Sequence, residues 1–417
     1  MIKAHLYRLL LITIILLSSP TFATSSSENI SLLKLVDQAY PVANPKAHTG
    51  IIIQSAKTGK ILFQRNSEQL FIPASIQKLF VATASLLYLH PDFTYSTTIT
   101  SLVKPSHHLL NGDIYIHFSG DPYFSSKDLD ELFHTLKKQG VDVITGNIYL
   151  DTSAFDDVYY PPGWLWDDLS YSFAAPLSAA NINQNKFLLH LTTDKPSQTK
   201  PILSVNLPTS LIKLSNNARI TQGYYKNCPL TVHSDTNNNY VIAGCIAKNH
   251  KVQRRSLAIR NPKPYVKLEV KQAAVAQAIK YNAIEFKAAT GTQQHLLANH
   301  DSATLSDIVK HMLTQSDNLA ADALLKTIGH VYYEKPGTWQ NGIHAMQHIF
   351  KGSANIDLSS SIITDGAGLS RYNLMSPQQF SQLLYFIQQQ NQLSSDLKAA
   401  LPKPGEAGTL AYRMKSY

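Results

Sequence analysis

The sequence predicts an α/β (α+β) fold whose main domain is interrupted by a β-rich insertion. Three observations along the 417 residues predict it. Two short β-branched runs are followed at once by a long apolar helical segment, a stretch of short strand-like runs comes next, and helical periodicity then resumes. The composition, 44% hydrophobic and 16% charged, excludes the disordered, collagen-like and coiled-coil classes.

The first 23 residues have the pattern of a secretory signal peptide. Lys3 and Arg8 give a positive start, residues 9–17 form a short apolar core, and small residues up to Ala23 supply a cleavage site. The apolar core is shorter than the roughly 18 residues that a membrane helix needs, and no later run reaches that length. We therefore expect an exported, periplasmic protein with no transmembrane anchor in its mature chain. An uncleaved membrane anchor is the alternative.

Turn signals and periodicity place the next elements. Residues 31–40 predict a helix. Residues 50–54 and 60–63 predict two strands around a turn at residues 57–59, where a glycine gives the required backbone angle. Residues 75–90 are apolar nearly all round, so they predict a buried central helix.

The β-rich insertion is predicted at residues 97–292. Short strand-like runs, such as residues 147–150, alternate there with clusters of Asn and Pro. We therefore place the signal peptide at residues 1–23 and the main domain at residues 24–96 and 293–417. The helices predicted after the insertion are residues 305–313, 318–328, 342–350 and 377–390.

Cys228 and Cys245 are the two cysteines of the chain. An even count in an oxidising compartment favours one disulfide over a metal site. Between them, two short strand-like runs flank a polar turn at residues 234–239, so the bridge would close a β-hairpin. Two buried free thiols are the alternative.

Ser75 and Lys78 form a Ser-x-x-Lys tetrapeptide at the start of the apolar helix. Residues three apart share a helix face, and the positive end of the helix dipole favours an alkoxide on Ser75. Burial would lower the pKa of Lys78, so that its amine could accept the serine proton. In the alternative interpretation Ser75 only caps the helix. The Ser-x-x-Lys pattern also begins at five other serines, none of which opens a long apolar helical segment: Ser31, Ser101, Ser197, Ser210 and Ser395.

A second candidate element is Ser316-Asp317-Asn318, which lies between two predicted helices. A turn at this point could direct the Ser316 hydroxyl and the Asn318 amide into a cleft. The hydroxyl could relay a proton to a leaving amine, and the amide could hold a substrate carbonyl. The alternative is a simple helix cap, because Ser, Asp and Asn all favour that position.

These two elements belong to the Ser-x-x-Lys, Ser-Asp-Asn and Lys-Thr-Gly set of class A β-lactamases and penicillin-binding proteins. With them and the segments below, the chain resembles the class C low-molecular-mass penicillin-binding proteins. These are the exported serine D-alanyl-D-alanine carboxypeptidases and endopeptidases of the penicillin-binding protein 4 type. The further segments that carry the resemblance are Ser119-Gly120-Asp121-Pro122, residues 160–168, residues 300–305, residues 336–339 and residues 365–373.

The resemblance implies a serine β-lactamase/DD-peptidase-like catalytic domain and assigns roles to its residues. Ser75 would attack the carbonyl of the penultimate D-Ala of a peptidoglycan stem peptide, and Lys78 would take its proton. Ser316 would relay a proton to the leaving nitrogen, and Asn318 would bind the acyl chain of the substrate. β-Lactam antibiotics would acylate the same serine as inhibitors. No cofactor is implied.

The third motif, Lys-Thr-Gly, does not occur after Asn318; the matches at residues 48–50 and 57–59 both precede Ser75. The strand that carries it supplies a cation for the substrate carboxylate and an N–H of the oxyanion hole. We therefore expect a carboxy-terminally truncated chain whose catalytic sheet lacks strands. The alternative function is a catalytically impaired relative with at most weak wall-peptide binding, or a β-lactamase or esterase of the same fold.

Other ligand classes have little support in the sequence. A net charge of +9 favours anionic surroundings without choosing among them. No phosphate loop, dinucleotide fingerprint or basic aromatic patch is present, so we expect no nucleic-acid partner. His344 and His348 lie four apart but have no third ligand nearby in the sequence, so we expect no metal. The oligomeric state is left open.

Overall fold

The structure, a computed structural model, describes most of the chain after residue 47. The chain divides into two compact units, Met1–Gln69 and Leu70–Tyr417, which are described separately. The predicted signal peptide at residues 1–23 and, apart from Lys34, the predicted helix at residues 31–40 lie outside the described residues. The described residues are 34, 48–193, 198–223, 227–248, 252–289 and 295–413.

The first unit contains one antiparallel strand pair. Strand β1 (Ile51–Gln54) pairs with β2 (Ile61–Arg65), as predicted from the two β-branched runs. Gly59 lies in the connecting turn with a φ of 73°, a left-handed conformation that glycine adopts without a steric penalty. Its N–H donates to the carbonyl of Ser55 at 2.8 Å.

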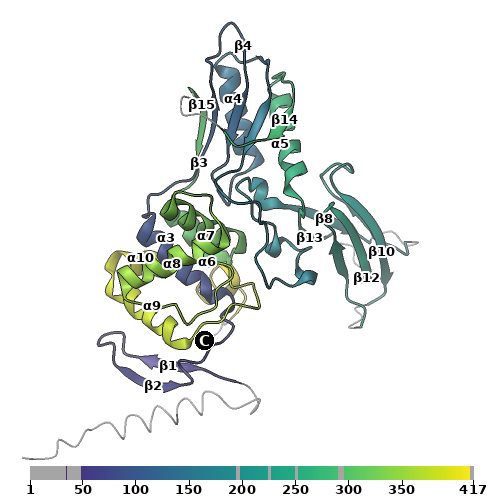
Figure 1. The fold of residues 1–417 in the computed structure, drawn as a ribbon. Helices are drawn as coiled ribbons and strands as arrows, with labels where there is room; N and C mark the ends of the chain where they lie inside the picture. Colours follow the sequence, from purple (N-terminus) through teal and green to yellow (C-terminus); the bar gives the residue numbers. More distant parts are fainter. Residues whose placement is uncertain are drawn as a thin grey trace, which may run out of the picture. The chain divides into compact units, whose positions relative to one another are not determined.

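Six helices of the second unit, α3 and five that come late in the sequence, form one packed group around α3 (Lys78–Tyr88). In Figure 1 this blue helix lies among green and yellow helices that come from the far end of the sequence. The Phe80 ring packs edge-on against Phe350 and Phe380, with centroids 5.2 and 5.1 Å apart. The other helices of this group are α6 (Leu305–Gln315), α7 (Asn318–Tyr333), α8 (Trp339–Ala354), α9 (Pro377–Gln389) and α10 (Asn391–Ala400).

Helices α6, α7, α8 and α9 confirm the four helices predicted after residue 292. Helix α10 is not predicted from the sequence. The start of α9 follows from local chemistry, because Ser376 accepts a hydrogen bond from the N–H of Gln379 and Pro377 occupies the first helical position. The central helix, in contrast, begins later than predicted. A 3₁₀ turn (Ala74–Gln77) precedes α3, so the α-helix starts at Lys78 rather than at Ser75.

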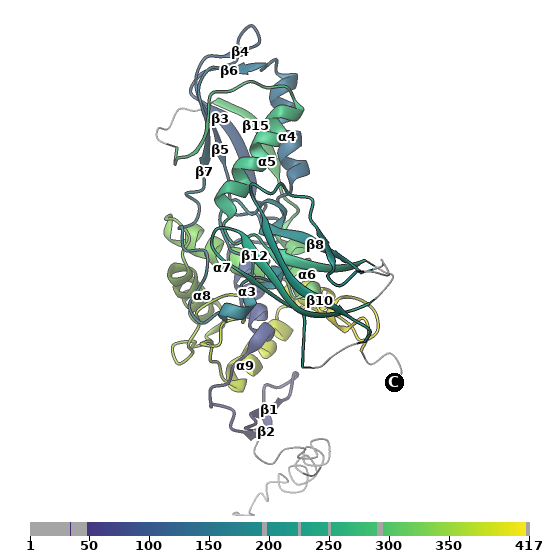
Figure 2. The same cartoon turned by 90° about the vertical axis from the view of Figure 1, so that its right-hand side faces the viewer.

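A five-stranded mixed sheet forms one part of the region predicted as the insertion. Its first and last strands along the chain are neighbours: Ser96 of β3 lies opposite Asp301 of β15. The chain therefore enters and leaves this sheet side by side. Helices α4 (Ser126–Lys138) and α5 (Pro262–Ala276) lie on one face of the sheet (Figure 2). The strand order is β14 (Ile284–Phe286), β7 (Ile148–Asp151), β5 (Ile114–His117), β3 (Ser96–Ser101) and β15 (His295–Asp301).

The remaining strands form smaller sheets. Cys228 and Cys245 are joined by a disulfide with their Cα atoms 5.3 Å apart. Cys245 lies in β12 (Asn239–Ala247), which pairs antiparallel with β11 (Thr231–Ser234). The Cys245 N–H also donates to the Cys228 carbonyl at 3.1 Å. These sheets comprise β8 (Lys186–Thr192) with β9 (Ile202–Ser204) and β13 (Gln253–Ala258); β10 (Lys213–Thr221) with β12 (Asn239–Ala247) and β11 (Thr231–Ser234); and β4 (Leu109–Leu110) with β6 (Val143–Ile144).

The exact limits of the insertion stay a prediction. The predicted boundary after residue 292 falls just before β15, which hydrogen-bonds into the same sheet as β3 and β5. In the part of the chain that the structure describes, no helix combines the length and the apolar character that crossing a membrane requires.

Candidate active site

Ser75 is presented by a tight backbone turn rather than by a regular helix end. The preceding residue, Ala74, has a φ of 50°, and Ser75 is the second residue of the 3₁₀ turn. The cap position of that turn is Pro73, so the structure does not support the alternative in which Ser75 caps a helix. The Ser75 side chain is exposed, whereas Lys78 one turn later is buried.

The amine of Lys78 connects three separate segments of the chain. Its Nζ lies 3.1 Å from Ser75 Oγ, 2.7 Å from Asn318 Oδ1 and 2.7 Å from the carbonyl oxygen of Ala367. Lys78 is 1% exposed, and burial lowers its pKa to about 8. Nearby carboxylates, Asp322 foremost, oppose this shift. Near neutral pH the amine is thus much closer to accepting a proton than an exposed lysine would be.

The Ser-Asp-Asn turn is held by its middle residue. Ser316 ends α6 in the left-handed region with a φ of 56°. Asp317 caps α7, and its Oδ1 accepts a hydrogen bond from the Ala320 N–H at 3.1 Å. Because Asp317 caps the helix, the side chains of Ser316 and Asn318 are not needed as caps and can contact Lys78 or a substrate. Asn318 uses its Oδ1 for Lys78, and its Nδ2 donates to the Phe173 carbonyl at 2.7 Å.

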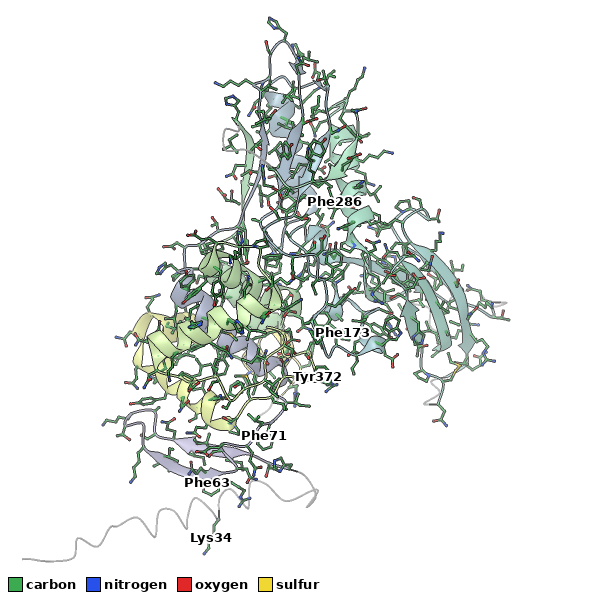
Figure 3. The ribbon with its side chains drawn as sticks, viewed as in Figure 1. Lys34, Phe63, Phe71, Phe173, Phe286 and Tyr372 are labelled. Atoms are coloured by element: carbon green, nitrogen blue, oxygen red, sulfur yellow. A yellow bond between two sulfur atoms is a disulfide. The ribbon has the colours of Figure 1, made fainter. Side chains whose placement is uncertain are left out.

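The β-rich region contributes directly to this turn. Gln184 Nε2 donates to the second Asp317 oxygen, Oδ2, at 2.6 Å. Gln184 itself has a φ of 59° and lies between two other residues with positive φ, Asn183 and Asn185. Phe173, labelled in Figure 3, presents an exposed ring next to the carbonyl that Asn318 contacts. An open cavity of about 350 Å³ adjoins the turn, lined by Ser172, Phe173, Gln184, Lys186, His311, Gln315, Ser316, Asp317, Asn318 and Leu319.

A glycine-containing loop packs on the back of the site. The Ala367 carbonyl that contacts Lys78 belongs to it, and the neighbouring Asp365 is fully buried. Gly368 has a φ of 76°, and a Cβ at this position would lie 1.9 Å from the Ala74 carbonyl oxygen. The loop backbone therefore packs directly against the residue that precedes Ser75.

The structure thus brings three of the predicted residues into direct contact: Ser75, Lys78 and Asn318. Ser316 lines the cavity beside Asn318, and among the described residues no hydrogen bond of its hydroxyl to Ser75 or Lys78 is found. Cys228 and Cys245 lie in the β-rich region and are not among the residues that contact Lys78.

Sequence reasoning missed several residues that build this site. Asp322 had a detectable signal, because it follows Asn318 by four residues and so shares its helix face. Asp365 belongs to residues 365–373, which carry the family resemblance, but the pattern of this segment assigns it no role. Gln184 had no signal, since only the fold brings the insertion to the Ser-Asp-Asn turn.

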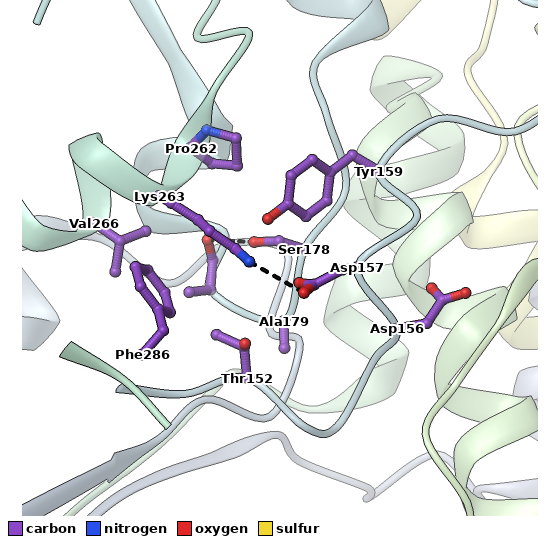
Figure 4. Close-up of a pocket in the computed structure, with 11 residues that line it drawn as sticks. Thr152, Asp156, Asp157, Tyr159, Ser178, Ala179, Pro262, Lys263, Val266 and Phe286 are labelled. Carbon is purple, nitrogen blue, oxygen red and sulfur yellow. Dashed lines mark hydrogen bonds and ion pairs between the residues drawn. The ribbon is translucent and has the colours of Figure 1, made fainter. Parts of the chain in front are cut away.

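Two other groupings of polar residues lie outside this site. Figure 4 shows a small pocket in the insertion where Lys263 Nζ pairs with Asp157 Oδ2 at 3.0 Å. Asp128, Glu131 and His300 each place one potential metal-ligand atom within 4.8 Å of the others. Asp128 already accepts hydrogen bonds from the N–H and hydroxyl of Ser125 at the start of α4, so a helix cap accounts for its position.

Comparison with known sequences finds relatives over nearly the whole chain. The profile of the D-Ala-D-Ala carboxypeptidase 3 (S13) family matches residues 34–417. The D-alanyl-D-alanine carboxypeptidase DacB of Haemophilus influenzae is 32% identical over 399 residues, which cover 95% of this chain and 80% of the relative. A D-alanyl-D-alanine carboxypeptidase of Actinomadura sp. is 27% identical over 429 residues, covering 95% and 76%.

Solved structures give the same result for the fold. Penicillin binding protein 4 (dacB) from Haemophilus influenzae aligns with a TM-score of 0.81 at 30% identity, over 91% of this chain and 83% of the other. The same protein complexed with a novel β-lactam aligns with a TM-score of 0.77 at 29% identity, over 91% and 82%. The aligned part is large enough to include both the helical group and most of the β-rich region.

Proposed function

The chain belongs to the D-Ala-D-Ala carboxypeptidase 3 (S13) family, and from this premise we propose that Ser75 and Lys78 carry its peptidase chemistry. The family assignment confirms the resemblance stated from the sequence, and the chain is a serine D-Ala-D-Ala carboxypeptidase with a penicillin-binding protein 4 fold. One observation supports the assignment of residues above all others. The buried Lys78 amine lies 3.1 Å from the exposed Ser75 hydroxyl, with a pKa lowered to about 8.

Acylation begins with proton transfer inside this pair. Neutral Lys78 accepts the Ser75 hydroxyl proton while Oγ attacks the carbonyl carbon of the penultimate D-Ala. The C–N bond to the terminal D-Ala breaks, and the proton passes from Lys78 through the Ser316 hydroxyl to the leaving nitrogen. Asn318 keeps its Oδ1 on Lys78 and one amide N–H on the Phe173 carbonyl, and its second amide N–H binds the acyl chain.

Deacylation repeats these steps with water as the nucleophile. Lys78, neutral again after the first step, accepts a proton from the water that adds to the acyl carbonyl. The ester bond to Ser75 then breaks, and Lys78 returns the proton to Oγ. A β-lactam acylates the same oxygen by ring opening, which retains its leaving nitrogen in the adduct and yields a stable acyl-enzyme. A structure of the H. influenzae relative complexed with a β-lactam supports this part of the proposal.

The physiological substrate in this proposal is the stem peptide of peptidoglycan, acted on in the periplasm. Cleavage of a terminal D-Ala is carboxypeptidase action, and release of a cross-linked stem is endopeptidase action on the same bond type. In this proposal the stem peptide lies along the cavity of about 350 Å³ that Ser316 and Asn318 line. Without Lys3 and Arg8 of the predicted signal peptide the net charge falls from +9 to +7, and this positive charge is also suited to an anionic wall polymer.

The proposal is tested with a fluorescent penicillin and a D-Ala-D-Ala peptide. Ser75→Ala is expected to abolish both covalent labelling and D-Ala release. Ser210→Ala is the matched control, because Ser210 begins the same tetrapeptide pattern but is exposed in the β-rich region. Labelling that survives in Ser75→Ala, or a parent chain that never labels, would contradict the proposal. Rapid penicillin turnover without a stable adduct would favour a β-lactamase instead.

A further inference from the structure

Asp322 is a buried acid that the mechanism above does not use. It lies on α7, one turn after Asn318, and is 0% exposed. Its Oδ1 accepts hydrogen bonds from the backbone N–H groups of Gly366 and Ala367, at 2.7 and 3.0 Å. A side chain that binds two consecutive peptide N–H groups fixes the position and the orientation of that peptide segment.

The segment that Asp322 holds is the one that contacts the base. The carbonyl of Ala367 lies 2.7 Å from Lys78 Nζ, so one residue joins the Asp322 carboxylate to the Lys78 amine. Asp365 anchors the same loop from within, because its Oδ1 accepts from the Gly368 N–H at 2.8 Å. Displacing this loop would move the acceptor that directs the Lys78 amine.

The charges around Lys78 also single out Asp322. Asp322 on α7 is joined to the Lys78 amine through the single residue Ala367. Its negative charge, with those of Asp365 in the loop and Asp317 at the start of α7, raises the pKa of Lys78 against the effect of burial. Burial raises the pKa of Asp322 well above its usual range, the Asp365 charge adds to this, and Lys78 opposes it. Asp322 Oδ2 is buried without a hydrogen-bond partner among the described residues. Lys326, one turn further along α7, is the other cation influenced by Asp322.

We propose that Asp322 is a positioning residue for the general base: it fixes the Ala367 carbonyl that orients the Lys78 amine toward Ser75, and it places an acidic side chain one residue away from that amine. The inference rests on the proposed roles of Ser75 and Lys78. Asp322 acts through the Ala367 peptide and not by contact with the substrate or with Ser75.

Two substitutions at this position separate its two effects. Asp322→Asn keeps an oxygen for the two N–H groups and removes the negative charge, so the Lys78 amine loses its proton at lower pH. The acidic limb of the pH profile for penicillin acylation is then expected to move down by about one pH unit. Asp322→Ala removes the acceptor altogether. Its acylation rate constant is expected to fall about 10²-fold with little change in non-covalent penicillin affinity.

A second readout does not depend on catalysis. The full chain is labelled with ¹³Cε-lysine, Lys78→Met identifies the resonance of Lys78, and its titration is followed in the parent chain and in Asp322→Asn. Asp156→Asn is the matched control, since it also removes a carboxylate from a buried lysine of α7 but does not act on Lys78. It is expected to lower thermal stability and to leave the Lys78 titration unchanged.

The outcomes are distinguishable. A lower titration midpoint for Lys78 in Asp322→Asn, with none in Asp156→Asn, supports the inference. The same midpoint in the parent chain and in Asp322→Asn overturns it, even if both variants lose stability. A third outcome combines a lower Lys78 titration midpoint in Asp322→Asn with a parent chain that is never acylated on Ser75. It would contradict the proposed function and leave the role of Asp322 at Lys78 supported.

Discussion

Lys78 is the residue on which the geometry of the site depends. A lysine ammonium has three N–H donors, and all three have an acceptor here: the Ser75 hydroxyl, the Asn318 amide oxygen and the Ala367 carbonyl. This saturation fixes the amine in one place, while burial makes its charge costly. In the neutral amine two N–H groups remain, enough for the Asn318 and Ala367 oxygens, and the lone pair can accept the proton of the Ser75 hydroxyl 3.1 Å away.

The pH dependence of acylation follows from this environment. Only the neutral amine can take the Ser75 proton, and burial lowers the pKa of Lys78 to about 8. Below that pH the amine is protonated and acylation slows, by about tenfold per pH unit well below the midpoint. The rate constant for acylation by penicillin, measured at saturating penicillin, is expected to rise through a midpoint near pH 8. A rate that is flat across this range, or that falls as pH rises through it, would contradict the role of Lys78.

At the scale of an element, the loop behind Lys78 controls where Ser75 sits. Gly368 has a φ of 76°, and an added Cβ would lie 1.9 Å from the Ala74 carbonyl oxygen. Because that oxygen belongs to the backbone, the clash can be relieved only by moving the loop or the 3₁₀ turn. The glycine therefore allows the close approach on which the site geometry depends.

Gly368→Ala is accordingly expected to lower the acylation rate constant about 10²-fold, through displacement of Ser75 and Lys78. Gly352→Ala is the control, because a Cβ there meets no atom within 4 Å and Gly352 lies inside α8. That substitution should leave acylation unchanged and stabilise the chain by up to about 1 kcal/mol. Stopped-flow acylation and urea unfolding of both variants check the pair. Equal acylation by both would contradict the importance of the close contact.

A second element-scale contact joins α7 to the β-rich region. Lys326 has a fully buried side chain, and its amine donates to Asp156 and, at 2.9 Å, to the Val158 carbonyl. The amine also lies 4.6 Å from the centroid of the Trp339 ring. Burial lowers the pKa of Lys326, and the Asp156 carboxylate opposes that shift. The buried ammonium is therefore stabilised by its contact with Asp156.

Asp156→Ala leaves this buried ammonium without its carboxylate and is expected to reduce the free energy of unfolding by about 3 kcal/mol. The neighbouring Asp157→Ala removes an ion pair with Lys263 whose side chains are 70% and 42% exposed. Its cost is expected to stay below about 1 kcal/mol. Equilibrium urea unfolding measures both. Equal destabilisation by the two variants would show that burial of Lys326 does not govern the contact.

At the scale of the whole molecule, the disulfide and the peptidase site belong to different regions. Cys228 and Cys245 enclose a short loop in the β-rich region, and removing such a bridge costs about 3 kcal/mol in the chain-entropy account. The double variant Cys228→Ser/Cys245→Ser is expected to unfold at a lower temperature and to be proteolysed first near residues 228–245. Its penicillin acylation rate should match that of the parent chain. A large loss of acylation in a folded double variant would contradict this separation.

Much of the architecture could be predicted because its signals are local. The strand pair around Gly59, the apolar helix after Ser75 and the helix beginning at Asn318 each follow from residues close in sequence. The 3₁₀ turn at Ser75 could not be predicted in this way. It depends on the contact between Ala74 and Gly368, which lie almost 300 residues apart.

The site was predicted in part for the same reason. Ser75, Lys78, Ser316 and Asn318 stand in short motifs, so pattern and resemblance could identify them. Gln184 reaches the Ser-Asp-Asn turn only through the fold of the insertion. The third motif of the family, Lys-Thr-Gly, has no match among residues 319–417.

The central claim is that Ser75, activated by Lys78, is the residue that becomes acylated. The most direct test is mass spectrometry of the penicillin-treated chain, intact and after proteolysis. The account predicts one added penicillin per chain, located on the peptide that contains Ser75, and no adduct in Lys78→Met under the same conditions. An adduct on another residue, or an equal yield in Lys78→Met, would contradict it.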